Sequence, residues 1–153
     1  MIILRQKQFS IQLLLDKFVK VDNDLILERC EYGVLAKLLR NFKKLREKQD
    51  SSIFYDIKLV KSGENIGFIQ LSDEDDPTEV NITWLGIDDE FQNNGYCTRV
   101  LKALIPIFKK IGYKSVTLEV FPEAYAAQHV YEKIGFKYTK TDELGLKHMK
   151  LKL

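Results

Sequence analysis

A predicted strand, a glycine-containing turn and a predicted helix follow one another in the second half of this chain. Residues 80–87 form an apolar run that predicts a strand, and residues 98–111 carry apolar side chains at helical spacing. The turn Gln92-Asn93-Asn94-Gly95-Tyr96-Cys97 leads directly into the helix. The first backbone amides of a helix lack partners within it and lie at the positive end of its dipole. This order therefore predicts a binding site for a phosphate or pyrophosphate at the turn.

The length and composition predict one ordinary globular domain. The chain has 153 residues, of which 45% are hydrophobic and 30% are charged, and a chain of this size can bury a full core. We expect a single domain over residues 1–153, with residues 1–24 as an N-terminal extension whose structure the sequence does not predict. The net charge of +2 is too small to indicate a nucleic-acid partner. Because every apolar run is far shorter than the ~20 residues of a membrane span, we expect no membrane partner either.

The cysteines and histidines argue against a disulfide framework and against a metal site. Cys30 and Cys97 are the only cysteines, which favours a reducing, cytoplasmic location. The only histidines, His129 and His148, show no metal-ligand spacing with them. We therefore expect no bound metal, and we interpret His129 as an exposed helix residue. The charged residues among the first apolar ones do not match a signal peptide.

The hydrophobic pattern predicts a mixed sheet flanked by helices. The predicted strands cover residues 24–29, 54–60, 65–71, 80–87, 115–120, 136–139 and 146–153, and the predicted helices cover residues 31–48, 98–111 and 124–134. Gly112 and Gly135 mark helix ends. Pro106 is expected to kink or split its helix, and Pro122 suits a first helical position. The acidic run 73–76 is expected to form a solvated loop.

A second motif, Val130-Tyr131-Glu132-Lys133-Ile134-Gly135-Phe136, ends the last predicted helix. Together with Gln92-x-x-Gly95-x-Cys97, it resembles the GNAT superfamily of acyl-CoA-dependent N-acyltransferases over residues 80–136. The resemblance implies an α/β (α+β) fold with a mixed, mostly antiparallel sheet, splayed at its centre and flanked by helices. It also implies an N-acetyltransferase that uses acetyl-CoA as co-substrate and acetylates a primary amine by direct attack.

The resemblance implies a cofactor site made largely of backbone groups. The amides of Gln92, Asn93, Asn94, Gly95, Tyr96, Cys97 and Thr98 would hold the pyrophosphate. Gly95 would let the backbone come close because it has no Cβ atom. Backbone groups at Leu85, Gly86 and Ile87 would pair with the pantetheine arm in a gap beside the strand, as a sheet edge pairs with an added strand.

Two residues are candidates for the proton transfers. Tyr131 resembles the family's tyrosine that protonates the sulfur of coenzyme A; the alternative is a packed aromatic side chain. The carboxylate that many members place on the strand before the turn would fall at Asn81, which is not a base. Glu79 lies on the same strand face and could act directly or through water, or could simply be a solvated strand-end residue.

The chain departs from the family pattern at two positions. Cys97 stands where glycine or alanine is usual, and Ala124 stands where an asparagine often contacts the cofactor. A helix N-terminus lowers a thiol pKa, so Cys97 could be a nucleophile, but we favour a structural cysteine. Arg99 could supply positive charge that the neutral residues of the turn lack.

Two alternatives to an enzyme remain. Ala124 and the missing base suggest a non-catalytic acyl-CoA sensor or regulatory protein. The lysines of residues 31–48 suggest a protein- or RNA-binding helix, although a solvated face is the simpler interpretation. Nothing in the sequence identifies the acceptor, which could be a protein N-terminus, a lysine or a small-molecule amine. The oligomeric state, monomer or dimer, is equally open.

Overall fold

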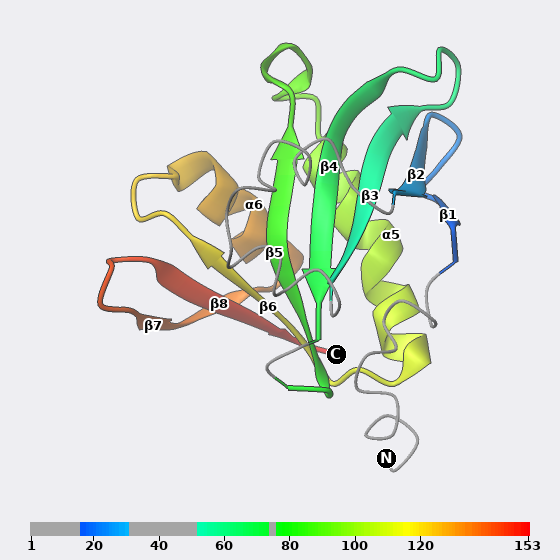
Figure 1. Cartoon of the computed structure of the whole chain (residues 1–153). Coiled ribbons are helices and arrows are strands. Elements are labelled where there is room, and N and C mark those ends of the chain that lie inside the picture. Colours follow the sequence, from blue (N-terminus) through cyan, green and yellow to red (C-terminus); the bar gives the residue numbers. More distant parts are fainter. Residues whose placement is uncertain (1–15, 31–51, 74–75) are drawn as a thin grey trace, which may run out of the picture.

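The computed structural model describes residues 16–30, 52–73 and 76–153 (Figure 1). This part of the chain forms one 8-stranded sheet and two α-helices. The strands are β1 (Phe18–Lys20), β2 (Leu25–Cys30), β3 (Ser52–Leu59), β4 (Asn65–Ser72), β5 (Glu79–Ile87), β6 (Ser115–Val120), β7 (Lys137–Thr141) and β8 (Lys147–Lys152). The helices are α5 (Tyr96–Ile111) and α6 (Tyr125–Ile134), and a short 3₁₀ helix, η2, covers Asp89–Phe91.

The sheet is mixed and mostly antiparallel, as predicted. Its strand order is β1-β2-β3-β4-β5-β6-β8-β7. Only the central pair β5–β6 is parallel, and the other neighbours are antiparallel. In Figure 1, β5 and β6 meet near one end of the sheet and diverge toward the other. The sheet is therefore splayed at its centre.

The splay coincides with a bulge in β5. The paired residues of β5 and β6 run only from Glu79–Ser115 to Ile82–Leu118, although β5 continues to pair with β4 as far as Ile87. On β4, Gln70 pairs with Trp84 and the next residue, Leu71, pairs with Ile82. Thr83 therefore has no partner on β4 and is the extra residue of the bulge. A bulge bends its strand and increases the local twist. This bend accounts for the separation of β5 from β6 beyond Ile82.

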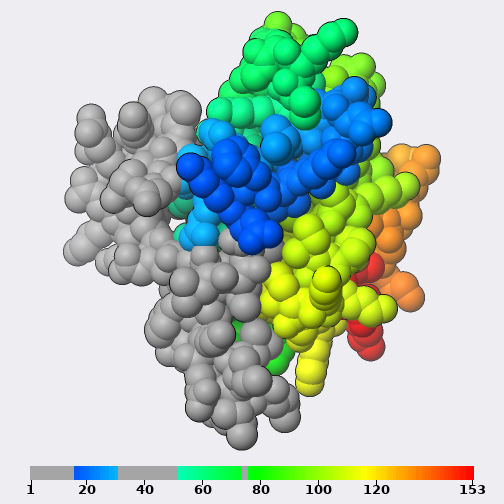
Figure 2. All heavy atoms as spheres, turned by 90° about the vertical axis from the view of Figure 1, so that its right-hand side faces the viewer, coloured from blue at the N-terminus to red at the C-terminus, as the bar shows by residue number. Residues whose placement is uncertain are grey.

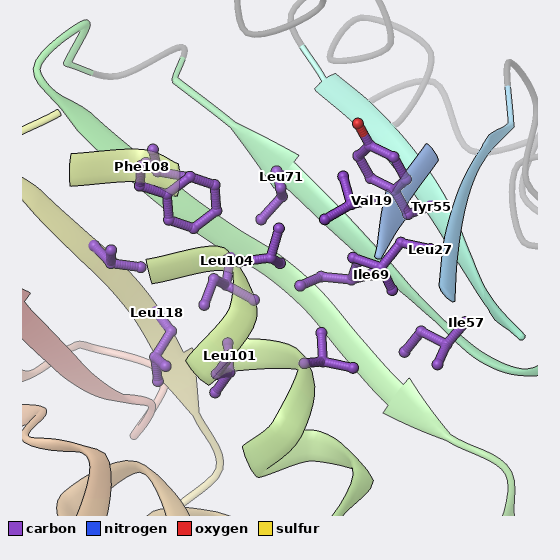
Figure 3. Packing of buried hydrophobic residues seen from close by; sticks show 14 of the residues in the cluster. Val19, Leu27, Tyr55, Ile57, Ile69, Leu71, Leu101, Leu104, Phe108 and Leu118 are labelled. Carbon is purple, nitrogen blue, oxygen red and sulfur yellow. The ribbon is translucent and has the colours of Figure 1, made fainter. Parts of the chain in front are cut away.

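Helix α5 covers the core of the sheet with one apolar face. Its buried residues are Val100, Leu101, Leu104 and Phe108, at the spacing of a single helix face. Figure 3 shows Leu101, Leu104 and Phe108 pointing toward the sheet, where Leu71 of β4 and Leu118 of β6 lie opposite them. Since α5 begins at the turn, this packing anchors the turn at the divergent end of β5.

The structure corrects two expectations about prolines. Helix α5 runs unbroken through Pro106, so the proline does not split the helix, while a kink stays a prediction. Pro106 has no amide hydrogen to donate to the carbonyl of Lys102, four residues earlier. Both residues are exposed, so water can bond to that carbonyl. Pro122 is not the first helical residue, because it lies in the turn ahead of α6, which begins at Tyr125.

The predicted helix ends at glycines were confirmed. Gly112 and Gly135 follow α5 and α6 with φ of 117° and 121°, and the amide of each bonds back to the last turn. Strand β1 was not predicted, since its three residues are too few for a periodic signal. The predicted helix over residues 31–48 and most of the 1–24 extension lie outside the described residues.

The first residue of the acidic run 73–76 is buried, although the sequence predicted a solvated loop. Asp73 is 2% exposed, and the Tyr113 hydroxyl donates to its Oδ2 at 2.9 Å. Burial raises the pKa of Asp73, while the bond from Tyr113 opposes that rise. The expectation of a solvated loop was therefore wrong for Asp73. None of the helices in the described ranges has the length and apolar composition of a membrane span.

Candidate active site

The turn between η2 and α5 presents a row of unpaired backbone amides. In the described part of the chain, no acceptor takes the amides of residues 93–98, and the first amide to find one is that of Arg99, which donates to Gly95 O at 3.1 Å. The turn needs positive φ at Asn93 (65°) and at Gly95 (76°). The Asn94 side chain closes it by donating to the carbonyls of Phe91 and Gln92, each at 3.1 Å. These amides point away from the helix and form an anion-binding cradle.

The free edge of β5 lies beside this cradle. The Asp88 amide donates to Ile66 O at 2.8 Å, toward β4. Because backbone groups alternate between the two edges of a strand, those of Leu85 and Ile87 face the gap between β5 and β6. Those of Gly86 face β4, where Gly86 pairs with Phe68. Of the three predicted residues, Leu85 and Ile87 can therefore pair with a ligand in the gap.

Gln92 connects the strand edge to the cradle. Its Nε2 donates to Ile87 O at 2.8 Å and to Asp89 Oδ1 at 3.2 Å. Its own amide donates to Asp89 O at 3.3 Å, so it is less available to an anion than the amides that follow it. The Gln92 side chain thus occupies the carbonyl of Ile87 that faces the gap.

Tyr131 lies on α6, beside the first turn of α5. Its side chain is 8% exposed, and its ring packs edge-on against Phe136 with 5.8 Å between centroids. Burial, and to a smaller extent the neighbouring Cys97 thiol, raise the pKa of Tyr131 above its usual value. The hydroxyl therefore stays protonated through neutral and moderately alkaline pH, as a proton donor must.

Cys97 behaves as a structural residue. It is partly buried and packs against the hydrophobic core. Burial raises the pKa of its thiol to about 11, so the thiol is protonated at neutral pH, whereas a nucleophile must be a thiolate. The arrangement supports the structural interpretation over the catalytic one.

Arg99 is already engaged by carboxylates. Its Nε lies 2.6 Å from Asp22 Oδ2, and its terminal nitrogen lies 3.1 Å from Asp24 Oδ2. The hydrogen bond from Arg99 lowers the pKa of Asp22 to about 2. Figure 2 shows the segment of β1 and β2 lying along α5, where these contacts form. Arg99 therefore does not offer the turn the uncompensated charge that we expected, and instead ties Asp22 and Asp24 to α5.

Glu79 lies at the closed end of the β5–β6 pair. It pairs with Ser115, and its Oε1 is 2.6 Å from Lys150 Nζ. Ile82, the last paired residue of β5, is about 10 Å further along the strand. Asn81 donates from Nδ2 to Thr117 Oγ1 at 3.0 Å, so it joins the two strands. A role of Glu79 as base stays a prediction, and at this distance it would act through water.

The sequence pattern did not predict a cluster formed by Glu119, Asp142 and His148. His148 Nε2 lies 2.9 Å from Asp142 Oδ2, and His148 Nδ1 lies 3.8 Å from Glu119 Oε1. One donor atom from each residue lies within 4.8 Å of the others, and no further such group occurs in the residues that the structure describes. His148 and Asp142 form a hydrogen bond, so we interpret the cluster as a hydrogen-bonded pair with the carboxylate of Glu119 beside it. Only the pairing of β6 with β8 brings Glu119 beside His148.

The loop before α6 is held by a side chain other than the one at Ala124. Ala124 is the N-cap residue of α6 and provides no side-chain cap. Gln128, which is 5% exposed, donates from Nε2 to the carbonyls of Phe121 and Pro122 at 2.8 and 3.0 Å. The Tyr138 hydroxyl in turn donates to Gln128 Oε1 at 2.8 Å. The loop is therefore ordered without an asparagine at position 124.

The fold and this site define an acyltransferase class, and a comparison with protein families agrees. The chain matches the Acetyltransferase (GNAT) family over residues 22–136. It belongs to this family and is an acetyltransferase.

Solved structures support the same fold. A GNAT family acetyltransferase from Elizabethkingia anophelis with acetyl-CoA bound aligns with a TM-score of 0.69 at 20% identity, over 86% of this chain and 100% of that chain. A Bacillus subtilis acetyltransferase in complex with CoA aligns with a TM-score of 0.66 at 18% identity, over 85% of this chain and 98% of that chain. An IAA acetyltransferase from Bacillus cereus aligns with a TM-score of 0.69 at 16% identity, over 84% and 99%. No curated protein matches the sequence.

Proposed function

We propose that this protein transfers the acetyl group of acetyl-CoA to a primary amine by direct attack of the amine on the thioester. One observation carries the proposal: β5 parts from β6 next to a cradle of unpaired amides at the start of α5. Coenzyme A has a pyrophosphate for such a cradle and an amide-bearing pantetheine arm for a free strand edge. The neighbours bound to acetyl-CoA or CoA support this choice of ligand.

The positions of the residues support the following roles. The amides of the turn, above all those of Asn93 to Thr98, hold the pyrophosphate. Leu85 and Ile87 pair with the pantetheine amides. When the arm pairs with Ile87 O, it takes the place of the Gln92 side chain. Tyr131 donates a proton to the departing sulfur, for which a tyrosine that stays protonated is suited.

The acceptor is a primary amine, either a protein N-terminus, a lysine side chain or a small molecule. The nitrogen must be neutral to attack, and an α-amine with a pKa of ~7.7–8.0 needs less help from a base than a lysine with ~10.4. Glu79 acting through water is one candidate base. We retain a cytoplasmic location, which the free thiols of Cys30 and Cys97 support, and we propose either a monomer or a dimer.

A non-catalytic acyl-CoA sensor is the second candidate function. The ion pair of Glu79 with Lys150 at the closed end of the strands favours it, because no base there meets the thioester directly. A sensor would bind acetyl-CoA but release no free coenzyme A with any amine.

Two measurements distinguish the acetyltransferase from the sensor. We expect acetyl-CoA at 100 times its Kd to stabilise the protein by ~2.7 kcal/mol in thermal unfolding, with ATP giving much less. A thiol-detecting assay with a panel of amines should then show release of coenzyme A. Absence of stabilisation would contradict both functions, whereas stabilisation without release would leave only the sensor.

Gly95→Asp is expected to weaken acetyl-CoA binding at least tenfold, measured by calorimetry. The aspartate would place a side chain and a negative charge in the cradle. Gly63→Asp is the matched control, because Gly63 has φ of 73° against 76° at Gly95, and an added Cβ meets nothing within 4 Å at either position. Equal losses of affinity in the two variants would show that backbone strain, not the cradle, is responsible.

A further inference from the structure

The half of the sheet formed by β5, β6 and β8 has one polar face. Directly paired residues point to the same side of a sheet. Asn81 pairs with Thr117, Thr117 with Lys150, and Glu119 with His148, so all of these side chains share one face. The bond from Asn81 Nδ2 to Thr117 Oγ1 confirms that the first two meet there.

The opposite face carries α6 and therefore Tyr131. Leu118 of β6 pairs with Met149 of β8, and Met149 pairs with Tyr138 of β7. The Tyr138 hydroxyl bonds to α6 at Gln128 and Glu132, each at 2.8 Å, which places α6 on this apolar face. A thioester between β5 and β6 would thus have Tyr131 on one side and the polar face on the other.

Glu119 stands where the gap opens on the polar face. It is the first residue of β6 after the last pair, Leu118–Ile82. Its side chain is 50% exposed. An amine in the gap on the side opposite Tyr131 would lie near this carboxylate.

His148 is held in one orientation behind Glu119. Its Nε2 faces Asp142 Oδ2 at 2.9 Å. Asp142 is itself fixed, because its Oδ1 accepts the amides of Leu144 and Leu146 at 2.9 and 3.0 Å. The hydrogen bond from His148 is the main cause that lowers the pKa of Asp142, so the carboxylate stays ionised and favours the Nε2–H tautomer. The lone pair of Nδ1 then faces Glu119, at 3.8 Å from Oε1.

We propose that Glu119 binds the cationic form of the acceptor amine and that His148 Nδ1 accepts the proton that the nitrogen loses, with Asp142 as a positioning residue. The inference rests on the proposed function. The bound cation first gives one proton to His148 Nδ1, which releases it to water. The neutral amine that remains attacks the thioester, so that the C–N bond forms and the C–S bond breaks. The nitrogen's second proton then passes to His148, the sulfur takes the proton of Tyr131, and exchange with water restores both residues.

The charges around His148 fit this role. Glu119 faces it from β6, Asp142 faces it from the β7–β8 turn, and Lys140 is its partner on β7. On β8 itself, Lys147 adjoins His148, and Lys150 is paired with Glu79. Carboxylates therefore flank both ring nitrogens, and they would stabilise the imidazolium that forms when the proton arrives.

His148→Gln is expected to lower kcat/KM for the amine at least tenfold and to flatten the acid side of the pH–rate profile, because the variant lacks the group that accepts the proton. His129→Gln, on the exposed side of α6, should change neither. Asp142→Asn should also lower the rate, and Glu119→Gln should mainly raise KM for the amine. The probes are a peptide with a free N-terminus, an N-blocked lysine peptide and a linear diamine.

The acetyl-CoA thermal shift separates this inference from the proposed function. Each variant should keep that shift, so a lost shift would mean damaged cofactor binding and would overturn the assigned roles. The assigned roles would also be overturned if the pH–rate profile of His148→Gln were unchanged. The same holds if Glu79→Gln, and not His148→Gln, flattened the acid side of the profile. Loss of wild-type activity in EDTA would overturn them too, because the cluster would then hold a metal. Spectra of ¹⁵N-labelled histidine should show the Nε2–H tautomer for His148, and an Nδ1–H tautomer contradicts the proposal even without turnover.

Discussion

Tyr131→Phe is expected to lower kcat about 1,000-fold, within the range by which a positioned acid accelerates a reaction. The phenylalanine keeps the edge-on packing against Phe136 but cannot protonate the sulfur. Because the pKa of Tyr131 is raised, the wild-type rate should show no loss from its ionisation up to about pH 9, below the ordinary tyrosine pKa of ~10. The measurement is steady-state release of coenzyme A across pH.

Tyr125→Phe is the matched control for this result. Tyr125 lies on the same helix but is 76% exposed, so its hydroxyl can be removed without effect on the site. Tyr131→Phe should leave the acetyl-CoA thermal shift unchanged, which separates chemistry from binding. A kcat for Tyr131→Phe equal to that of Tyr125→Phe at every pH would eliminate the acid role.

Gly67→Ala is expected to destabilise the fold by about 3 kcal/mol or more, as severe overpacking does. A Cβ atom at Gly67 would lie 2.2 Å from Gly86 O and 3.1 Å from Ile87 Cα. Both are backbone atoms of β5, which cannot move without breaking the β4–β5 ladder. For a chain of this size the loss corresponds to a fall in Tm of roughly 6–12 °C, measured by calorimetry.

Gly86→Ala gives the comparison. Its added Cβ would approach Trp84 Nε1 at 3.0 Å, and Trp84 is a 49% exposed side chain that can rotate away. We expect a much smaller fall in Tm than for Gly67→Ala. Equal Tm values for Gly67→Ala and Gly86→Ala would contradict this prediction. The close approach of β4 and β5 at Gly67 would then not constrain β5, the strand that borders the gap.

Local patterns predicted most of the elements for identifiable reasons. The apolar face of α5 shows a single period from Val100 to Phe108, and glycines with positive φ end both helices. The predicted split at Pro106 was wrong because the effect of a proline depends on which face of the helix it occupies. The predicted solvated loop was wrong at Asp73 because the burial of this residue depends on Tyr113, which is distant in sequence.

The amide cradle and the tyrosine could be recognised without knowledge of the fold, since each belongs to one short contiguous segment. The turn from Gln92 to Cys97 directs its amides through local backbone conformation alone, and the Tyr131 motif is a single helix end. No local segment predicts that β5 leaves β6 after Ile82 or that Glu119 lies beside His148 and Asp142. Those contacts depend on strand register between distant segments, and register is set by the packing of the whole sheet.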